Sequence, residues 1–378
     1  MTPDRYRKEF PHTSRGLIYL NHAAVSPMSQ RVRQAITRLM DARQFENIEY
    51  WPQAMEEKNL LKEDIAKLLN LTPQRIAIVP NTSTGLNILA QGINWQAGDH
   101  ILLNNFEFPA NVYPFLNLER KGVVVDVIPH RNGRILLEDL AQAITPRTRL
   151  IAISFVEFLN GFKNDLYAIG ELCRQHNLWL AVDGIQGIGV QSLDITRARI
   201  DFLSVGGQKW LMWPLGTAFI WISERLFAHL QPPFLGWLSV EDSWNFFDYN
   251  MTLLPDAGRF EPGTHNLMGI VGARAALTFF LELRINTIEQ HLFTLTDYLT
   301  EGLQELGYTV LSDRSSSHKS QIVTFAAKNG EALWHYLLKR GIRVSLREGN
   351  IRVSPHFYNT QEEIDQFLKA LRQWQDGG

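Results

Sequence analysis

The sequence has a single cysteine among 378 residues, Cys173, so no disulfide can form within the chain. It also lacks an excess of either charge: 37 Lys and Arg against 39 Asp and Glu give −2, which argues against polyanion binding. No apolar run approaches the roughly 20 residues that cross a bilayer, and the charged first residues do not resemble a signal peptide. We therefore expect a cytoplasmic protein that binds neither nucleic acid nor a membrane.

The central third of the chain alternates between short apolar, β-branched runs and segments of helical period. The apolar runs are hydrophobic along nearly their whole length, which is typical of parallel strands buried on both faces. This pattern predicts a mainly parallel sheet wrapped by helices. The expected strands are Ile101–Leu103, Val123–Ile128, Leu150–Phe155 and Leu178–Val182, and the expected helices are Ala110–Arg120, Glu138–Ile144 and Leu166–His176.

The rhythm changes after Trp221, where a loop rich in aromatic residues and proline leads to a long helical segment from Gly269 to Leu283. Beyond it, helical and strand-like segments mix in an α+β pattern. We predict a small C-terminal domain over residues 269–378, a large domain over 21–268, and an N-terminal segment, 1–20, packed on the small domain.

Two predicted strands end in residues that carry chemistry. The strand at Leu178–Val182 runs into Asp183 and Gln186, and a later apolar strand runs into a glycine pair followed by Lys209. The carboxyl ends of parallel strands form the ligand crevice of an open α/β sheet, so these side chains are expected to meet. Taken singly, Asp183 could be a helix cap and Lys209 a surface charge.

In this order the motifs resemble those of fold type I pyridoxal-phosphate enzymes, specifically the class V aminotransferase and cysteine desulfurase family, in its isopenicillin N epimerase-like branch. The resemblance implies an α/β fold with a mainly parallel large domain and a smaller α+β domain. It spans nearly the whole chain through the motifs YLNHAA, NTSTGLN, EFPANVYP, VDGIQ, GGQKW, RFEPGT and RVSPHFYNTQEEID.

The resemblance assigns the central chemistry to three residues and the cofactor pyridoxal 5′-phosphate. Lys209 is expected to hold the cofactor as a Schiff base and then to move protons at the substrate Cα. Asp183 is expected to pair with the protonated pyridine nitrogen, which keeps the ring electron-withdrawing. Gln186 is expected to bond the phenolic oxygen, although its amide could bond only backbone.

The cofactor's phosphate is expected at the helix start that holds Thr82 and Ser83, where unpaired N–H groups favour an anion. The family's serine and histidine beside the lysine correspond here to Gly206 and Gln208, so Gly206 offers only backbone. Thr264, in the RFEPGT turn, is expected to reach the phosphate of a neighbouring subunit. The implied assembly is a homodimer with shared active sites.

The remaining expected contacts surround the ring and the amino acid substrate. Phe108 takes the place of a stacking histidine and can stack without moving protons. Arg352 matches the arginine that binds the substrate α-carboxylate in a bidentate pair. Asn21 and His22 lie in a loop that lines the cleft in relatives. His22 could either contact the substrate or only pack within the loop.

Glu157 and Asn160 follow a strand close to where the family places an amide near the ring, but the spacing does not match, and neither is assigned. No metal site is predicted. Among activities we expect a class V aminotransferase, with a C–S lyase or other β-eliminating lyase, an epimerase, or a non-catalytic cofactor-binding protein as alternatives. The stretch SLREGNIRVSP lacks the nucleophilic cysteine of desulfurases, and Cys173 is expected to be a buried helix residue, so we predict that the protein is not a cysteine-nucleophile desulfurase.

Overall fold

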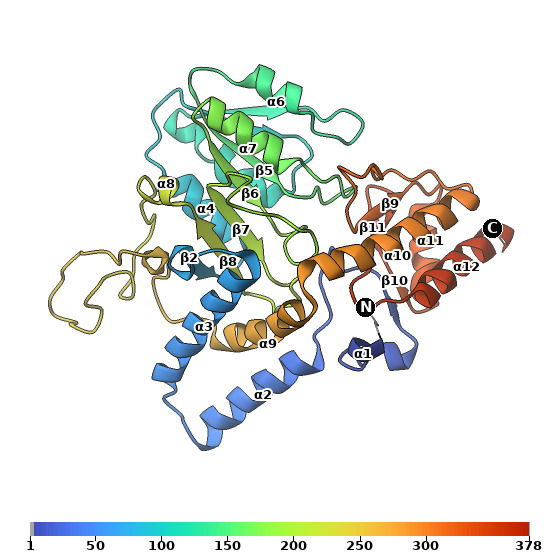
Figure 1. Cartoon of the computed structure of the whole chain (residues 1–378), viewed down its shortest axis with the longest axis horizontal. Helices are drawn as coiled ribbons and strands as arrows, with labels where there is room; N and C mark the ends of the chain where they lie inside the picture. Colours follow the sequence, from blue (N-terminus) through green and yellow to red (C-terminus); the bar gives the residue numbers. More distant parts are fainter. Residues whose placement is uncertain (1–3, 378) are drawn as a thin grey trace.

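The computed structural model describes residues 4–377 and shows a large α/β part followed by a smaller α+β part (Figure 1). A seven-stranded sheet with the order β2-β8-β7-β6-β5-β3-β4 forms the centre of the large part. All neighbouring strands are parallel except β8, which is antiparallel to β2 and β7. The predicted fold class is confirmed. The strands are β2 (Ile76–Val79), β3 (His100–Asn104), β4 (Val124–Ile128), β5 (Thr148–Ser154), β6 (Trp179–Asp183), β7 (Phe202–Gly206) and β8 (Ala218–Ile222).

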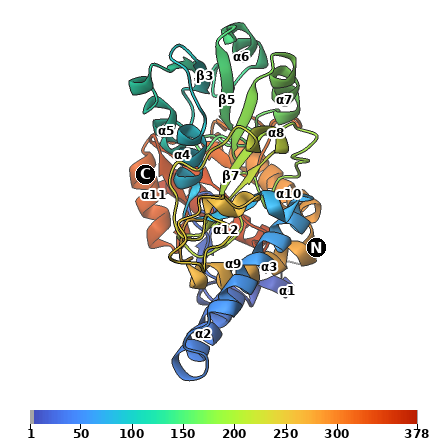
Figure 2. The ribbon, with the colours of Figure 1, turned by 90° about the vertical axis from the view of Figure 1, so that its left-hand side faces the viewer.

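The strands β2, β5, β6, β7 and β8 are buried along almost their full length because helices cover both faces of the sheet. Two apolar clusters, one on each face, account for this burial. Helix α2 extends from the body of the molecule, as Figure 2 shows. The first nine helices in chain order are α1 (Asp4–Arg7), α2 (Gln30–Phe45), α3 (Trp51–Leu69), α4 (Thr82–Gly92), α5 (Tyr113–Leu116), α6 (Leu137–Ala143), α7 (Leu166–Gln175), α8 (Glu224–Phe227) and α9 (Leu267–Leu283), of which α1 contacts the small part through Arg7 and Glu363.

The helix expected over Ala110–Arg120 is replaced by three short pieces, of which α5 is the middle one. Pro114 has no N–H group to bond the carbonyl of Ala110, so a continuous helix through this segment would lose a hydrogen bond and meet a steric clash. Two apolar residues of this segment, Phe115 and Leu118, are fully buried. The helical spacing of apolar residues in this segment therefore indicated correctly which side chains are buried, but it did not indicate a single continuous helix.

The C-terminal part contains an antiparallel sheet of β9 (Val323–Phe325), β12 (Asn350–Val353) and β11 (Ser345–Arg347). The N-terminal strand β1 (Ile18–Tyr19) pairs in parallel with β10 (Ile342–Arg343), and α9 packs on α2 and α3. The domain limits themselves stay predictions. No helix within residues 4–377 is long and apolar enough to span a bilayer. The remaining helices are α10 (Ile285–Glu305), α11 (Gly330–Lys339) and α12 (Gln361–Gly377).

Candidate active site

A cavity of about 470 Å³ lies where strands β6 and β7 end, and Asp183, Lys209 and Arg352 all line it. Asp183 is the last residue of β6, and Lys209 follows the end of β7 by three residues. Arg352 reaches the same cavity from β12 of the small part. The structure thus brings together the three side chains that carry the predicted chemistry, from segments far apart in the chain. The other lining residues are Ala23, Ala24, Asn81, Thr82, Ser83, Phe108, Ala110, Phe158, Ile185, Gln186, Gln208 and Arg347.

The carboxyl of Asp183 and the amine of Lys209 influence each other within this cavity. Burial raises the pKa of Asp183, while the N–H of Ile185, 3.0 Å from Oδ1, and the charge of Lys209 oppose the rise. Burial lowers the pKa of Lys209, and the carboxylate of Asp183 opposes that fall. The site therefore offers an amine that is readily neutral, as a nucleophile requires, and a buried carboxylate suited to a cationic partner.

The start of α4 provides a cradle for an anion. Asn81 caps the helix by accepting a hydrogen bond from the N–H of Thr84 at 2.8 Å, and the hydroxyl of Thr82 is buried without a partner in the described chain. A side chain at Gly206 would lie 2.8 Å from that hydroxyl and 2.7 Å from Gln208 Oε1, so the glycine keeps this space open. Free helix N–H groups, a spare hydroxyl and an amide fit a phosphate.

Arg352 is fully buried and has no acidic partner among residues 4–377. Nη1 donates to the carbonyl of Phe158, Nη2 to Ser345 Oγ at 3.5 Å, and Nε has no partner. Burial, together with the nearby charge of Arg347, lowers the pKa of Arg352 to about 9. A buried guanidinium without a counter-ion fits an anionic ligand such as a carboxylate.

Asn21 and His22 lie beside the cavity without lining it. Asn21 Oδ1 accepts from Ser345 Oγ at 2.5 Å, so it supports a residue that Arg352 also contacts. Both ring nitrogens of His22 are bonded, Nδ1 with the carbonyl of Ser354 at 2.9 Å and Nε2 with the hydroxyl of Tyr358 at 2.8 Å. These bonds give His22 a packing role, and its contact with substrate stays a prediction.

Gln186 lies in the cavity wall with its amide already engaged. Its Nε2 donates to the carbonyl of Ala23 at 3.0 Å, and its Oε1 accepts from the indole of Trp210 at 2.9 Å. The amide nitrogen carries two hydrogens, so one remains for a ligand. The predicted contact with the cofactor is compatible with this geometry and remains a prediction.

The cavity wall also includes Phe158 and Arg347, which the sequence reasoning missed. Phe108 is 46% exposed and meets Phe158 edge-to-face, with ring centroids 5.2 Å apart. The Nζ of Lys209 lies 5.7 Å from the Phe108 centroid. Phe158 could have been found because it follows β5 by four residues and strand ends form the crevice. Arg347 lies in the same strand-rich stretch as Arg352 but gives no separate signal.

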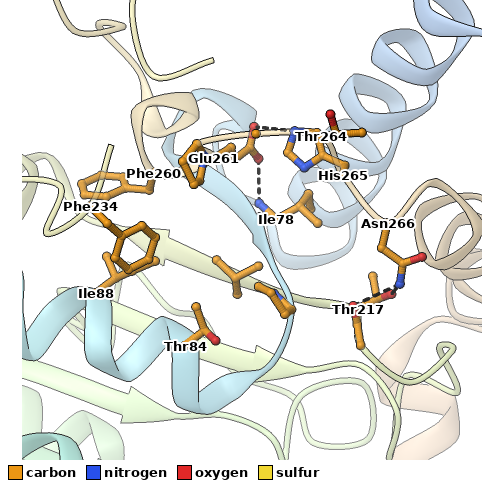
Figure 3. Close-up of a pocket in the computed structure, with 15 residues that line it drawn as sticks. Ile78, Thr84, Ile88, Thr217, Phe234, Phe260, Glu261, Thr264, His265 and Asn266 are labelled. Atoms are coloured by element: carbon orange, nitrogen blue, oxygen red, sulfur yellow. Dashed lines mark hydrogen bonds and ion pairs between the residues drawn. The ribbon is translucent and has the colours of Figure 1, made fainter. Parts of the chain in front are cut away.

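Thr264 lines a second cavity, of about 290 Å³, shown in Figure 3. The turn that carries it is fixed by Glu261, whose carboxylate accepts from the N–H of Ile78 at 2.7 Å and pairs with Lys58 and Lys62, each at 2.9 Å. Within one chain, Thr264 and Lys209 thus line different cavities. The contact of Thr264 with a partner's phosphate stays a prediction.

Glu157 and Asn160, for which the sequence predicts no role, are both buried outside the cavity. Asn160 ties the backbone together: Nδ2 donates to the carbonyl of Gly133 at 2.8 Å and Oδ1 accepts from the N–H of Phe162 at 2.9 Å. Glu157 Oε1 accepts from Asn164 Nδ2 at 2.9 Å, while its Oε2 has no partner in the described chain.

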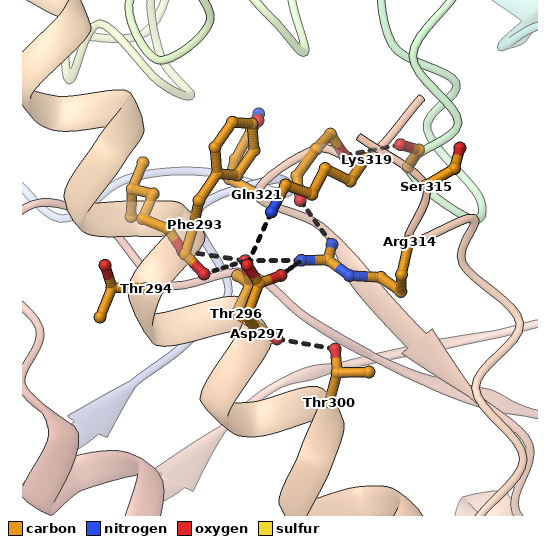
Figure 4. Close-up of polar contacts among 12 residues, drawn as sticks. Phe293, Thr294, Thr296, Asp297, Thr300, Arg314, Ser315, Lys319 and Gln321 are labelled. Carbon is orange, nitrogen blue, oxygen red and sulfur yellow. Dashed lines mark hydrogen bonds and ion pairs between the residues drawn. The ribbon is translucent and has the colours of Figure 1, made fainter. Parts of the chain in front are cut away.

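A loop of the small part, residues 311–321, holds the backbone of the site. Gln321 Nε2 donates to the carbonyl of Gln186 at 2.6 Å. Figure 4 shows how the loop is fixed to α10: Asp297 accepts from Arg314 and from Lys319, each at 2.6 Å. The strand end that carries Asp183 is therefore supported from the small part as well as by its own sheet.

The family model for class V aminotransferases matches residues 18–367. The chain belongs to this family. The match confirms the predicted family and, with it, the expected cofactor, pyridoxal 5′-phosphate, for which the cradle at Thr82 and the Lys209–Asp183 pair have the required chemistry.

Relatives and solved structures extend over almost the whole chain. The "Uncharacterized aminotransferase YcbU" of Bacillus subtilis is 26% identical, covering 96% of this chain and 95% of its own. A "Probable cysteine desulfurase" of Xylella fastidiosa is 30% identical, covering 97% and 94%. The apo structure of a cysteine desulfurase from Thermococcus onnurineus NA1 has a TM-score of 0.90 at 23% identity, covering 100% and 99%, which supports the shared fold. A complex of the cystine C–S lyase C-DES with cysteine persulfide has a TM-score of 0.87 at 24% identity, covering 96% and 99%.

The prediction of an aminotransferase that is not a cysteine-nucleophile desulfurase was wrong. Relatives carry the name cysteine desulfurase or probable cysteine desulfurase, including those of Xylella fastidiosa and Salmonella agona, each 30% identical and covering 97% and 84% of this chain. The exclusion rested on one side chain absent from one loop. That single difference cannot separate this chain from relatives that match most of its length and from a desulfurase that shares its whole fold.

Proposed function

We propose that the protein is a pyridoxal-phosphate-dependent enzyme that cleaves the Cβ–S bond of cysteine or a closely related sulfur-containing amino acid. The observation that carries the proposal is one cavity holding a buried amine, a buried carboxylate and a guanidinium without a counter-ion, Lys209, Asp183 and Arg352. The choice of C–S cleavage is supported by the relatives named as desulfurases and by the fold shared with a cystine C–S lyase.

When bound, pyridoxal phosphate supplies a sink for the negative charge that develops at the substrate Cα. Lys209 is the amine that would hold the cofactor's aldehyde and would take the proton from the substrate Cα, since burial favours its neutral form. Asp183 holds the proton on the ring nitrogen. Arg352 binds the substrate α-carboxylate and orients the Cα–H bond, and Asn21 supports it through Ser345.

The other predicted residues hold the cofactor in place. Thr82, Ser83, Gln208 and the backbone at Gly206 bind the phosphate, and Gln186 bonds the phenolic oxygen through its remaining N–H. Phe108, which lines the same cavity, would stack on the cofactor ring. In this proposal the working unit is a cytoplasmic homodimer in which Thr264 completes the partner's phosphate site.

The test is to incubate the cofactor-loaded protein with L-cysteine and with L-cystine, and to measure released sulfur together with the three-carbon product. We expect sulfur release that depends on Lys209, so that Lys209→Ala shows none. If the protein instead forms a new amino acid only when a keto acid is added, and releases no sulfur, the C–S cleavage proposal is wrong.

A further inference from the structure

Two buried acids lie behind Asp183, and the proposed chemistry uses neither of them. Glu107 and Glu157 are 8% and 0% exposed. Asn104 joins them, because its Nδ2 lies 2.8 Å from Glu107 Oε1 and 3.4 Å from Glu157 Oε1. Within residues 4–377, the other charged group that acts on them is Asp183, on the neighbouring part of the sheet, and no cation pairs with either. Two carboxylates placed in this way cannot both stay ionised at low cost.

The hydrogen bonds around Glu107 suit the ionised form. Its Oε1 accepts from Asn104 Nδ2 and from the N–H of Ser154 at 2.6 Å, and its Oε2 accepts from Ser154 Oγ at 2.5 Å. Burial raises the pKa of Glu107 to about 7, and the three donors directed at this carboxyl oppose the rise and stabilise the negative charge above that pH.

The surroundings of Glu157 suit the neutral acid. Asn164 donates through Nδ2 to Glu157 Oε1 at 2.9 Å, while Glu157 Oε2 and Asn164 Oδ1 are both buried without a partner in the described chain. One oxygen of the carboxyl and the oxygen of the amide are thus both buried without a hydrogen-bond donor, which indicates that the carboxyl carries a proton. Because Asn164 already donates to the other oxygen of this carboxyl, its Oδ1 is the candidate acceptor for a proton on Oε2. Burial raises the pKa of Glu157, and the charge of Glu107 raises it further.

We propose that Glu157 is a neutral carboxylic acid in the folded protein, that Glu107 beside it is ionised, and that the two are positioning residues for Asp183. The link to Asp183 runs through β5. Glu107 bonds both the N–H and the hydroxyl of Ser154, Ser154 pairs with Asp183 across β5 and β6, and the N–H of Phe155 donates to the carbonyl of Asp183 at 2.9 Å.

The charges give this arrangement a use. One negative charge near Asp183 strengthens its hold on a cationic partner, whereas a second would cost more than the buried site can stabilise. Neutral Glu157 therefore leaves a single anion, Glu107, behind the aspartate. The positioning role toward Asp183 rests on the proposed function, in which Asp183 holds the ring proton. The protonation of Glu157 does not depend on that function.

The first test measures the folding equilibrium of the full chain without added cofactor, by denaturant titration between about pH 5 and about pH 8. Glu157→Gln keeps the shape of the neutral acid and its donor. Wild-type Glu157 is protonated when folded and ionised when unfolded in this range, so its folding constant should fall relative to Glu157→Gln by about tenfold per pH unit. Glu261→Gln is the matched control: Glu261 is equally buried but paired with two lysines, so its loss of stability should not vary with pH in this range.

A ratio between wild type and Glu157→Gln that stays constant with pH would show that Glu157 is ionised in the folded protein and would overturn the proposal. Should Glu157→Gln fail to fold, infrared spectroscopy of the wild-type chain at about pH 8 decides the question. A carbonyl band from a buried protonated carboxyl supports the proposal, and its absence overturns it.

The second test addresses the effect on Asp183, using the cofactor-loaded protein and the pH titration of the cofactor's absorption. In Glu107→Gln the negative charge behind Asp183 is gone, so the ring nitrogen should lose its proton at a pH lower by about one unit. An unchanged midpoint would overturn the positioning role. If the protein binds no cofactor, the proposed function fails, whereas the folding and infrared measurements still decide the state of Glu157.

Discussion

At the scale of single residues, Asp183 is the most informative position for the chemistry. Asp183→Asn keeps the shape but removes the charge that pairs with the ring nitrogen, so we expect cofactor binding to persist and turnover to fall by about 100-fold or more. Steady-state kinetics and cofactor absorption measure the two effects. Asp165→Asn, at the exposed cap of α7, is the control and should leave turnover unchanged because asparagine caps equally well. Similar turnover in both variants would contradict the role of Asp183.

The reactivity of the Cys173 thiol is a second prediction for a single residue, because it measures how well α7 buries this side chain. It lies in α7 with 1% exposure, as the sequence predicted, and burial raises the pKa of its thiol to about 12. At pH 8 the thiolate fraction is about a thousandfold below that of an ordinary cysteine, so a disulfide reagent should modify the native chain at least that much more slowly than the unfolded chain. Rapid labelling of the native protein would show that α7 opens readily.

At the scale of elements, the turn from Arg259 to Thr264 depends on one buried acid. Lys58 and Lys62 of α3 hold the pKa of Glu261 at about 2, against the effect of burial. Because this pKa is lowered, the stabilisation is complete above the unfolded pKa of about 4.3 and is lost as the pH falls toward 2. Replacing Glu261 with leucine leaves two largely buried lysines without a counter-ion. The free energy of unfolding should therefore fall by about 3–5 kcal/mol near pH 7, as measured by denaturant unfolding. A loss under 1 kcal/mol would show that water reaches both lysines.

The elements also show what the sequence could and could not predict. The burial of β5 and β6 on both faces, and the meeting of Asp183 and Lys209 where strands end, were correctly predicted because continuous apolar runs and the crevice rule are local signals. The predicted strand Val123–Ile128 is instead the edge strand β4, in which Val124 and Val127 are exposed. The short helical pieces that begin at Pro109 were not predicted, because apolar residues at helical spacing do not distinguish one helix from several turns. The network around Glu107 and Glu157 was also missed, because its members come from three segments that only the folded sheet brings together.

At the scale of the whole molecule, one loop of the large part exposes many apolar side chains and reaches the second cavity at one end. The loop over residues 234–251, which projects from the large part in Figure 1, exposes several aromatic side chains, with Phe247 at 91% and Tyr249 at 87%. Exposed apolar patches of this kind are typical of interaction surfaces. Phe234 of this loop and Thr264 line the same cavity (Figure 3). We predict that a second copy of the chain covers these aromatic residues, and that Thr264 of one copy then lies near the phosphate site of the other.

A complementation experiment tests this predicted homodimer. Lys209→Ala removes the reactive amine, and Thr264→Trp blocks the turn, so each variant alone should be inactive. If Thr264 serves the partner's site, a heterodimer has one site in which both Lys209 and Thr264 are intact. Random exchange in an equal mixture makes about half of the dimers mixed, with one good site in two, so activity should return to about a quarter of wild type. A mixture that exchanges subunits, as shown by mass spectrometry, and stays inactive would place Thr264 in its own chain's site, because then no heterodimer could combine the two intact residues.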